Sequence, residues 1–145
     1  MAKVSTYLNF PRTTEAAFLF YRSVFGGEFV GGIRRVGDMP ADPTQPPLAD
    51  ADKNLVLHVA LPTLGEHVLM GTDASESMGF TVVQGNNAYI NLEPDTRAET
   101  ERLFNALAVG GKVEMALADM FWGAYFGSLT DQFGIHWMVN CESKK

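Results

Sequence analysis

A pair of adjacent glycines follows an apolar helical segment at two places, and this repeat constrains the fold more than any other feature. The first is FYRSVFGGEFV at residues 20–30, and the second is FNALAVGGKVE at 104–114, 84 residues further along. In each, we predict that the glycines end a helix and turn the chain into a strand. A phosphate-binding loop places its glycines before a helix, so their position disfavours a nucleotide site.

Two matching helices are predicted ahead of the glycine pairs, over residues 15–25 and 97–109. Their expected caps are Thr13 or Thr14 for the first helix, and a capping box of Thr96 with Glu99 for the second. Apolar residues three and four positions apart predict the buried faces. These are Ala16, Leu19, Phe20, Ser23 and Val24 in the first helix, and Thr100, Leu103, Phe104, Leu107 and Ala108 in the second.

Each copy is predicted to contain one strand, one helix and three further strands. The strands are expected at 4–10, 28–36, 54–61 and 67–71 in the first copy, and at 88–93, 112–118, 122–129 and 135–141 in the second. A parallel strand pair within each copy needs the helix as its crossover. We therefore predict an α+β fold with mixed sheets: a single domain, 1–145, of tandem βαβββ units at 4–74 and 84–142.

The last strands of the copies align at a different offset. GEHVLM at 65–70 matches GIHWMV at 134–139, 69 residues apart, so the first copy is expected to carry about 15 additional residues. The stretch 37–53, GDMPADPTQPPLADADK, has the proline and aspartate content of a surface loop and is predicted to be this insertion. The polar stretch 73–87, DASESMGFTVVQGNN, is expected to join the copies.

Composition argues against several functional classes. The formal net charge is -6, and basic residues are adjacent only at 34–35 and 144–145, so we expect no nucleic-acid binding. No apolar run approaches the ~20 residues of a membrane span, and the N-terminal MAKVSTYLNFP lacks the apolar block of a signal peptide. The single cysteine, Cys141, allows no internal disulfide and favours a cytoplasmic location.

Four stretches cover most of the chain and carry a family resemblance: YLNFPRTTEAAFLFYRSVFGGEF, GDMP, LHVALPTLGEHVLMGTD and MFWGAYFGSLTDQFGIHWMVNC. With the tandem βαβββ order, they resemble the glyoxalase/bleomycin-resistance/extradiol-dioxygenase superfamily, also called vicinal oxygen chelate proteins. The closer similarity is to its PhnB-like branch, also named a demethylubiquinone methyltransferase-like domain. This resemblance implies cupped sheets, a cavity inside each cup and a homodimer.

The resemblance also implies a divalent metal held by His, Gln and Glu, which binds substrate oxygens as a Lewis acid or an oxygen-activating iron. The matching positions here fall near residues 5–7, near Tyr89 and at Met138, and none is a histidine or a carboxylate. We therefore expect no catalytic metal in the standard position and no other cofactor. The only other trio of donors in the sequence is His136 with Glu93 and His58. No S-adenosylmethionine site is recognisable.

Strand alternation predicts which side chains face the cup, if Leu8 and Leu92 face the helices. The cup-facing set is Tyr7, Asn9, Tyr89, Asn91, Glu93, His136 and Met138. Two interpretations stay open. These residues form either the polar lining of a small-molecule pocket or a solvated rim on a half-exposed sheet.

Other residues have both structural and functional interpretations. His136 and His58 are the candidate acid–base residues, although a lone histidine in an apolar strand such as LVLHVAL is also consistent with a structural role. His67 is expected at a turn. Trp122 and Tyr125, in FWGAYFG, are core aromatics or ligand contacts. Cys141 has no identifiable base beside it and is expected to be inert.

Three functions are consistent with these residues. The first is a small-molecule binding protein on the superfamily scaffold, with an unknown ligand. The second is an enzyme of the same superfamily, of the lyase or dioxygenase type, with a metal-dependent or remodelled site. The third is a homodimeric scaffold with a vestigial cup. Fold alone does not decide among them.

Overall fold

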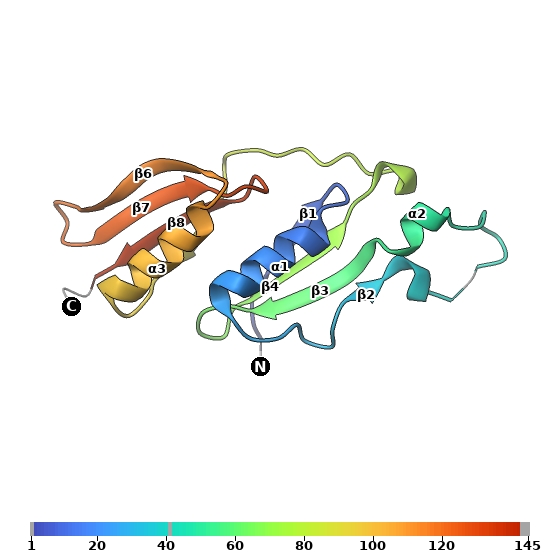
Figure 1. Cartoon of the computed structure of the whole chain (residues 1–145), viewed down its shortest axis with the longest axis horizontal. Coiled ribbons are helices and arrows are strands. Elements are labelled where there is room, and N and C mark those ends of the chain that lie inside the picture. The colour runs from blue at the N-terminus through green and yellow to red at the C-terminus, as the bar shows by residue number, and fades with distance from the viewer. Residues whose placement is uncertain (1, 41, 143–145) are drawn as a thin grey trace. The chain divides into compact units, whose positions relative to one another are not determined.

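The computed structural model describes residues 2–40 and 42–142, and its chain divides into two compact units, 1–82 and 83–145 (Figure 1). Each unit contains a four-stranded mixed sheet and one long helix. The predicted α+β fold class is confirmed. In the described part of the chain, no helix has the length and apolar character needed to cross a membrane.

The first unit has its strands in the order β1-β4-β3-β2. Its elements are β1 (Thr6–Phe10), α1 (Thr14–Phe25), β2 (Arg34–Arg35), a 3-10 turn at Val36–Asp38, α2 (Asp50–Lys53), β3 (Val56–Pro62), β4 (Val68–Asp73) and a 3-10 turn at Glu76–Met78. Strands β1 and β4 are parallel, and the other pairs are antiparallel. Helix α1 is the crossover between β1 and the rest of the sheet, and it packs on β3 and β4.

The second unit repeats this topology with the order β5-β8-β7-β6. Its elements are β5 (Ile90–Leu92), α3 (Arg97–Ala108), β6 (Lys112–Asp119), β7 (Tyr125–Thr130) and β8 (His136–Cys141). Strands β5 and β8 are parallel, and α3 packs on β6, β7 and β8. The predicted order of elements is therefore found in both units.

The buried face of α1 differs from the predicted one. Its buried residues are Thr14, Ala17, Phe18, Tyr21 and Val24, so only Val24 was assigned correctly. The ring of Phe18 lies against Gly71 of β4, where no side chain would fit. This orientation buries Phe18 and Tyr21, and aromatic side chains bury more area than the Ala16 and Leu19 of the predicted face.

The buried face of α3 was predicted correctly except at Ala108, which is half-buried. Its buried residues are Thr100, Leu103, Phe104 and Leu107. Phe104 lies against Gly127 of β7, as Phe18 lies against a glycine in the first unit. The Thr96 hydroxyl accepts a bond from the Glu99 N–H at 3.1 Å, so Thr96 caps α3 as predicted.

Two predicted strands are shorter than expected. The strand at 28–36 is reduced to β2, because Gly31 and Gly32 both have a φ of 73° and turn the chain. The strand at 122–129 begins only at Tyr125. Gly123, with a φ of 96°, closes a turn in which its N–H donates to the Met120 carbonyl at 3.0 Å.

The offset of 69 residues between the last strands is wrong by one. The hairpin before β4 is closed by a bond from Thr63 N–H to the His67 carbonyl at 3.0 Å, and the hairpin before β8 by one from Asp131 N–H to the Ile135 carbonyl at 2.8 Å. Equivalent positions are therefore 68 residues apart, and His67 corresponds to Ile135. Because a one-residue shift exchanges the faces of a strand, His67 and His136 face opposite sides of their sheets.

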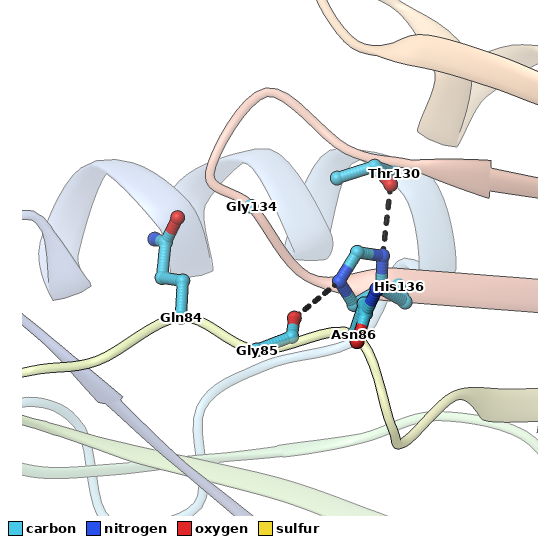
Figure 2. A pocket seen from close by; sticks show the side chains of 6 residues that line it. All are labelled: Gln84, Gly85, Asn86, Thr130, Gly134 and His136. Carbon is cyan, nitrogen blue, oxygen red and sulfur yellow. Dashed lines mark hydrogen bonds between the residues drawn. The ribbon is translucent and has the colours of Figure 1, made fainter.

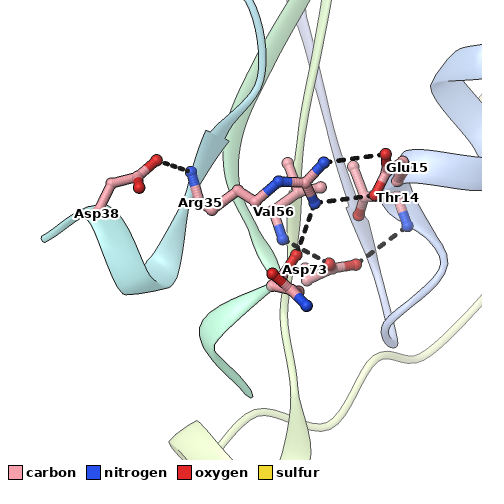
Figure 3. A network of polar contacts seen from close by, with 7 residues as sticks. Thr14, Glu15, Arg35, Asp38, Val56 and Asp73 are labelled. Carbon is pink, nitrogen blue, oxygen red and sulfur yellow. Dashed lines mark hydrogen bonds and ion pairs between the residues drawn. The ribbon is translucent and has the colours of Figure 1, made fainter. Parts of the chain in front are cut away.

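A buried carboxylate joins the helix of the first unit to its sheet (Figure 3). Asp73, at the end of β4, is 5% exposed. One of its oxygens accepts a bond from the Thr14 N–H at 3.0 Å, and the other accepts one from the Val56 N–H at 2.7 Å. The predicted threonine cap is absent, since the Thr13 side chain makes no capping bond. Asp73 thus provides the acceptor at the start of α1.

We predict that Asp73→Asn lowers the free energy of unfolding by about 1–3 kcal/mol, because the amide keeps one acceptor oxygen and turns an NH2 group toward the other buried N–H. Urea denaturation followed by circular dichroism measures this. The matched control is Asp50→Asn, at a side chain that is 97% exposed, with an expected change below about 0.5 kcal/mol. Equal stability of the two variants would contradict the role given to Asp73.

Candidate functional site

The predicted site residues of the first unit lie on the face of its sheet opposite α1, which we call its helix-free face. Tyr7 pairs with Met70 and Asn9 with Thr72, while the alternate residues of β4, Leu69 and Gly71, face the helix. Tyr7 and Asn9 are exposed, as their predicted orientation requires.

Tyr7 and His58 form a pair on this face. The Tyr7 hydroxyl and His58 Nδ1 are 3.2 Å apart, and the ring centroids are 5.7 Å apart. His58 is half-buried, and the described residues provide no hydrogen-bond partner for its Nε2. The structure therefore brings three predicted residues, Tyr7, Asn9 and His58, onto one face, with one imidazole nitrogen that no described residue engages.

The second unit has a corresponding tyrosine–histidine pair on its own helix-free face. Tyr89 lies beside His136, with ring centroids 5.1 Å apart. Asn91 of β5 pairs with Met138 of β8, and both belong to the same face. Four of the predicted residues, Tyr89, Asn91, His136 and Met138, are thus grouped in the second unit.

Both ring nitrogens of His136 are engaged (Figure 2). Nε2 lies 2.7 Å from the Gly85 carbonyl, and Nδ1 lies 2.8 Å from the Thr130 hydroxyl. A carbonyl only accepts, so Nε2 carries the proton and Nδ1 accepts from Thr130. His136 therefore holds the segment at 84–86 against β7, and a ligand would have to replace one of these bonds before using a ring nitrogen.

A shallow pocket of about 470 Å³ surrounds His136. Its lining consists of Gln84, Gly85, Asn86, Thr130, Gly134 and His136 (Figure 2). The buried carboxylate of Asp131 shapes the turn below it, since Oδ1 accepts from the Phe133 and Ile135 N–H groups at 2.8 and 3.1 Å. Oδ2 accepts from the buried indole of Trp137 at 2.8 Å. This network positions the start of β8 and hence His136.

Three predicted ligand residues lie apart from these groups. Tyr125 faces α3, where its hydroxyl donates to Glu101 at 3.1 Å and the Arg97 guanidinium lies 3.8 Å from its ring centroid. Trp122 is 55% exposed in the turn before β7, so its interpretation as a core aromatic is wrong. Glu93 is exposed just beyond β5.

The remaining histidine and the cysteine have structural surroundings. His67 precedes β4, and its ring nitrogens lie 2.8 Å from the hydroxyls of Thr6 and Thr63. These bonds connect β1 to the hairpin before β4, in keeping with the predicted position at a turn. Cys141 is buried at the end of β8.

One electrostatic feature of the second unit's helix-free face was not predicted. The Tyr89 hydroxyl donates to Glu114 of β6 at 2.9 Å. This hydrogen bond to the carboxylate, together with desolvation, raises the pKa of Tyr89 above its ordinary value of 10.0. The phenol therefore stays neutral at physiological pH and acts as a donor.

The residues at the superfamily's usual metal positions do not fit a divalent cation. They supply the hydroxyl of Ser5, the phenol of Tyr89 and the thioether of Met138, none of which is a strong ligand for a hard metal ion. Among residues 2–40 and 42–142, no group of three or more His, Cys, Asp or Glu side chains is arranged to hold a metal. Absence of a catalytic metal stays a prediction.

Comparison with known proteins assigns the family. A family model described as 3-demethylubiquinone-9 3-methyltransferase matches residues 2–140. The chain belongs to this family. It is similar to the crystal structure of protein PA1353 from Pseudomonas aeruginosa, at 37% identity over 98% of each chain and a TM-score of 0.82. It is also similar to the PhnB protein from Bacillus cereus, at 26% identity over 97% of this chain and 99% of that chain, with a TM-score of 0.71.

The fold predicted from the wider superfamily is also found. A glyoxalase/bleomycin resistance protein/dioxygenase family enzyme from Burkholderia phytofirmans PsJN shares the fold, with a TM-score of 0.64 and 23% identity over 95% of this chain and 98% of that chain. The PhnB-like assignment is therefore correct, and the fold is the one that the glyoxalase/bleomycin resistance protein shares. These names describe the relatives and leave the ligand of this chain open.

Sequence reasoning missed several members of the second unit's site. Gln84, Gly85 and Asn86 belong to the polar stretch that was expected only to join the copies. Thr130 and Glu114 gave no signal because their roles depend on register: Thr130 pairs with His136 across β7 and β8, and Glu114 reaches Tyr89 from β6. If the hairpin between Asp131 and Ile135 had been placed correctly, the sequence would have predicted that Thr130 lies opposite His136.

We predict that Glu114→Gln lowers the pKa of Tyr89 toward 10.0, because a neutral amide favours the protonated phenol less than a carboxylate does. NMR titration of tyrosine-labelled protein above pH 8 measures this pKa, and Tyr89→Phe assigns the resonance. Tyr125, which donates to Glu101, serves as the internal control and should not move. An unchanged Tyr89 titration would contradict the described bond.

Proposed function

We propose that this protein binds a small organic molecule on the helix-free faces of its sheets. The observation that supports this most directly is the tyrosine–histidine pair on that face of each unit. In these pairs, Tyr7 is 50% exposed and Tyr89 is 38% exposed. An aromatic surface with a polar edge, partly open to solvent, suits the stacking and orientation of a small ligand.

The polar groups beside each pair support the same proposal. Asn9 and His58 Nε2 in the first unit have no hydrogen-bond partner among the described residues, and neither has the Asn86 side chain in the pocket. Unused donors and acceptors next to an aromatic ring fix the orientation of a ligand in small-molecule sites.

A second candidate function is catalysis by a remodelled site without the usual metal. His58 favours it, because one ring nitrogen is held by Tyr7 and the other is available, which is the arrangement of an oriented acid–base residue. His136 has both nitrogens engaged and supports this alternative less. Binding is the broader proposal, since catalysis at His58 would also require a ligand on this face.

The binding proposal is tested by NMR of isotopically labelled protein with the uncharged probes benzamide and benzyl alcohol. We expect millimolar binding, as for ligands of this size, with shift changes gathered on residues of the helix-free faces. Tyr7→Ala and Tyr89→Ala should each weaken binding at their own face about fivefold, through loss of an aromatic contact. Leu19→Ala, on the solvent side of α1, is the control. Shift changes confined to the helices would contradict the proposal.

We further propose a cytoplasmic homodimer. The structural reason for this proposal is β6, an eight-residue edge strand whose residues are nearly all exposed. Val113 and Met115 on this strand are 44% and 46% exposed, and Phe121 in the following turn is 98% exposed. Open edges with apolar side chains favour association with another chain.

Analytical ultracentrifugation at micromolar concentration is expected to give about twice the chain mass of 15.9 kDa. Phe121→Ser should raise the dimer dissociation constant at least fivefold if this turn takes part, since a buried aromatic side chain stabilises an interface. Val83→Ser, at another exposed apolar residue, is the control. A single monomeric species near 15.9 kDa would contradict the homodimer.

A further inference from the structure

Two adjacent arginines of β2 point to opposite faces of the first unit's sheet. Arg35 turns toward α1, where its guanidinium bonds both oxygens of Glu15 at 2.8 and 3.0 Å and also donates to the Asn54 carbonyl at 2.8 Å (Figure 3). A register irregularity separates the two residues, and Arg34 pairs with His58 of β3. Directly paired residues share a face, so Arg34 lies on the helix-free face beside His58.

Arg34 differs from the other arginines because its guanidinium has no ion-pair, hydrogen-bond or cation–π partner in the described part of the chain, whereas each of the others has at least one. The partners of the others are Asp52 and Glu76 for Arg12, the Phe29 ring for Arg22, Glu15 for Arg35, Asp119 for Arg97 and Glu99 for Arg102. The chain has more acidic residues than basic ones, 17 against 11, yet none of them pairs with Arg34 in the described part of the chain. Arg34 is exposed and keeps its donors unused.

The face around Arg34 contains hydrogen-bond donors and no carboxylate. The strand residues on it are Tyr7, Asn9, Arg34, His58, Ala60, Pro62, Val68, Met70 and Thr72. The Asn9 amide can donate, and His58 donates through Nε2 when Nδ1 accepts the Tyr7 hydroxyl proton. The nearest acidic residue along β2 and its turn is Asp38, which accepts the Arg35 N–H at 3.0 Å.

The second unit does not repeat this arrangement. In the first unit, Arg34 of β2 pairs with His58 of β3. At the equivalent positions of the second unit, Ala118 of β6 pairs with Phe126 of β7. Its helix-free face instead carries Glu114 as the acceptor for Tyr89. The pairing of Arg34 with His58 is therefore a property of the first unit, whereas the helix-free face of the second unit carries the carboxylate of Glu114.

We propose that the helix-free face of the first unit binds the oxyanion group, carboxylate or phosphate, of a small organic acid, with Arg34 as its principal contact and His58 Nε2 as a further donor. This inference rests on the proposed function and names the ligand class of one of its two faces. A guanidinium binds two oxygens of such a group in a planar, bidentate geometry. The apolar surfaces of Ala60 and Met70, with the Tyr7 ring, provide the contact for the organic part of the ligand.

The test compares benzoate, phenyl phosphate and uncharged benzamide by NMR titration of the full chain at constant ionic strength. We expect at least one anion to bind about tenfold more tightly than benzamide, with shift changes at Arg34, His58 and Tyr7. A contact to a charged group has this magnitude. The tighter of the two anions identifies a carboxylate or a phosphate as the preferred group.

Variants distinguish the loss of the Arg34 charge from a loss of folding. Arg34→Gln should weaken anion binding about tenfold and leave benzamide unchanged, while Arg34→Lys should keep part of the anion affinity. Arg102→Gln is the matched control, because it removes the same charge from the outer side of α3 in the other unit. Unchanged amide spectra away from β2 confirm that each variant is folded.

Three results would overturn the inference. If benzoate, phenyl phosphate and benzamide bind the first unit equally and Arg34→Gln has no effect, small-molecule binding stands and the oxyanion site is wrong. If neither anion perturbs the first unit, the oxyanion site is also wrong, and the proposed function then depends on the uncharged probes at Tyr89 and His136. Equal losses from Arg34→Gln and Arg102→Gln would show a general effect of charge and no site.

Discussion

The parallel pairing of the first and last strands of each unit determines where every other element lies. Strand β1 pairs with β4, and β5 with β8, so each unit needs a helix to cross between parallel neighbours. That helix covers one face of the sheet and buries residues such as Leu69 in the first unit and Trp137 in the second. The opposite face carries the tyrosine, histidine and asparagine side chains together with apolar ones such as Met70 and Met138. Because alternation is strict within a strand, pairing of the edge strand also decides which residues become available to a ligand.

The same topology supports two chemically different faces. In both units a tyrosine lies beside a histidine, yet their environments differ. His136 is held through both nitrogens by Gly85 and Thr130, whereas His58 is held through one nitrogen by Tyr7. The first unit adds an unpartnered arginine, and the second adds a carboxylate that raises the pKa of Tyr89. Duplication therefore preserved the scaffold while the two faces diverged, which is compatible with different roles for the two units.

The sequence was sufficient for the order of elements and for the orientation of the first strand of each unit, because glycine pairs, capping signals and alternation are local features. It failed where register or packing decides. The buried face of α1 is set by how Phe18 meets Gly71, a contact between residues far apart in the chain. The match between HVLM and HWMV led to a one-residue error, since the identical histidines occupy different positions around their hairpins. Arg34 and Glu114 became candidates only when their cross-strand partners were known, because a charged residue on an edge strand has no distinctive sequence pattern.

The central claim is that the helix-free face of the first unit is a binding surface for a small organic acid. The most direct measurement is a crystal structure of the protein grown with benzoate. The account predicts benzoate on this face, with its carboxylate in bidentate contact with Arg34, an oxygen within hydrogen-bond distance of His58 Nε2, and its ring against Tyr7 and Met70. Benzoate bound elsewhere, or Arg34 paired with a carboxylate of the protein itself in that crystal, would contradict it.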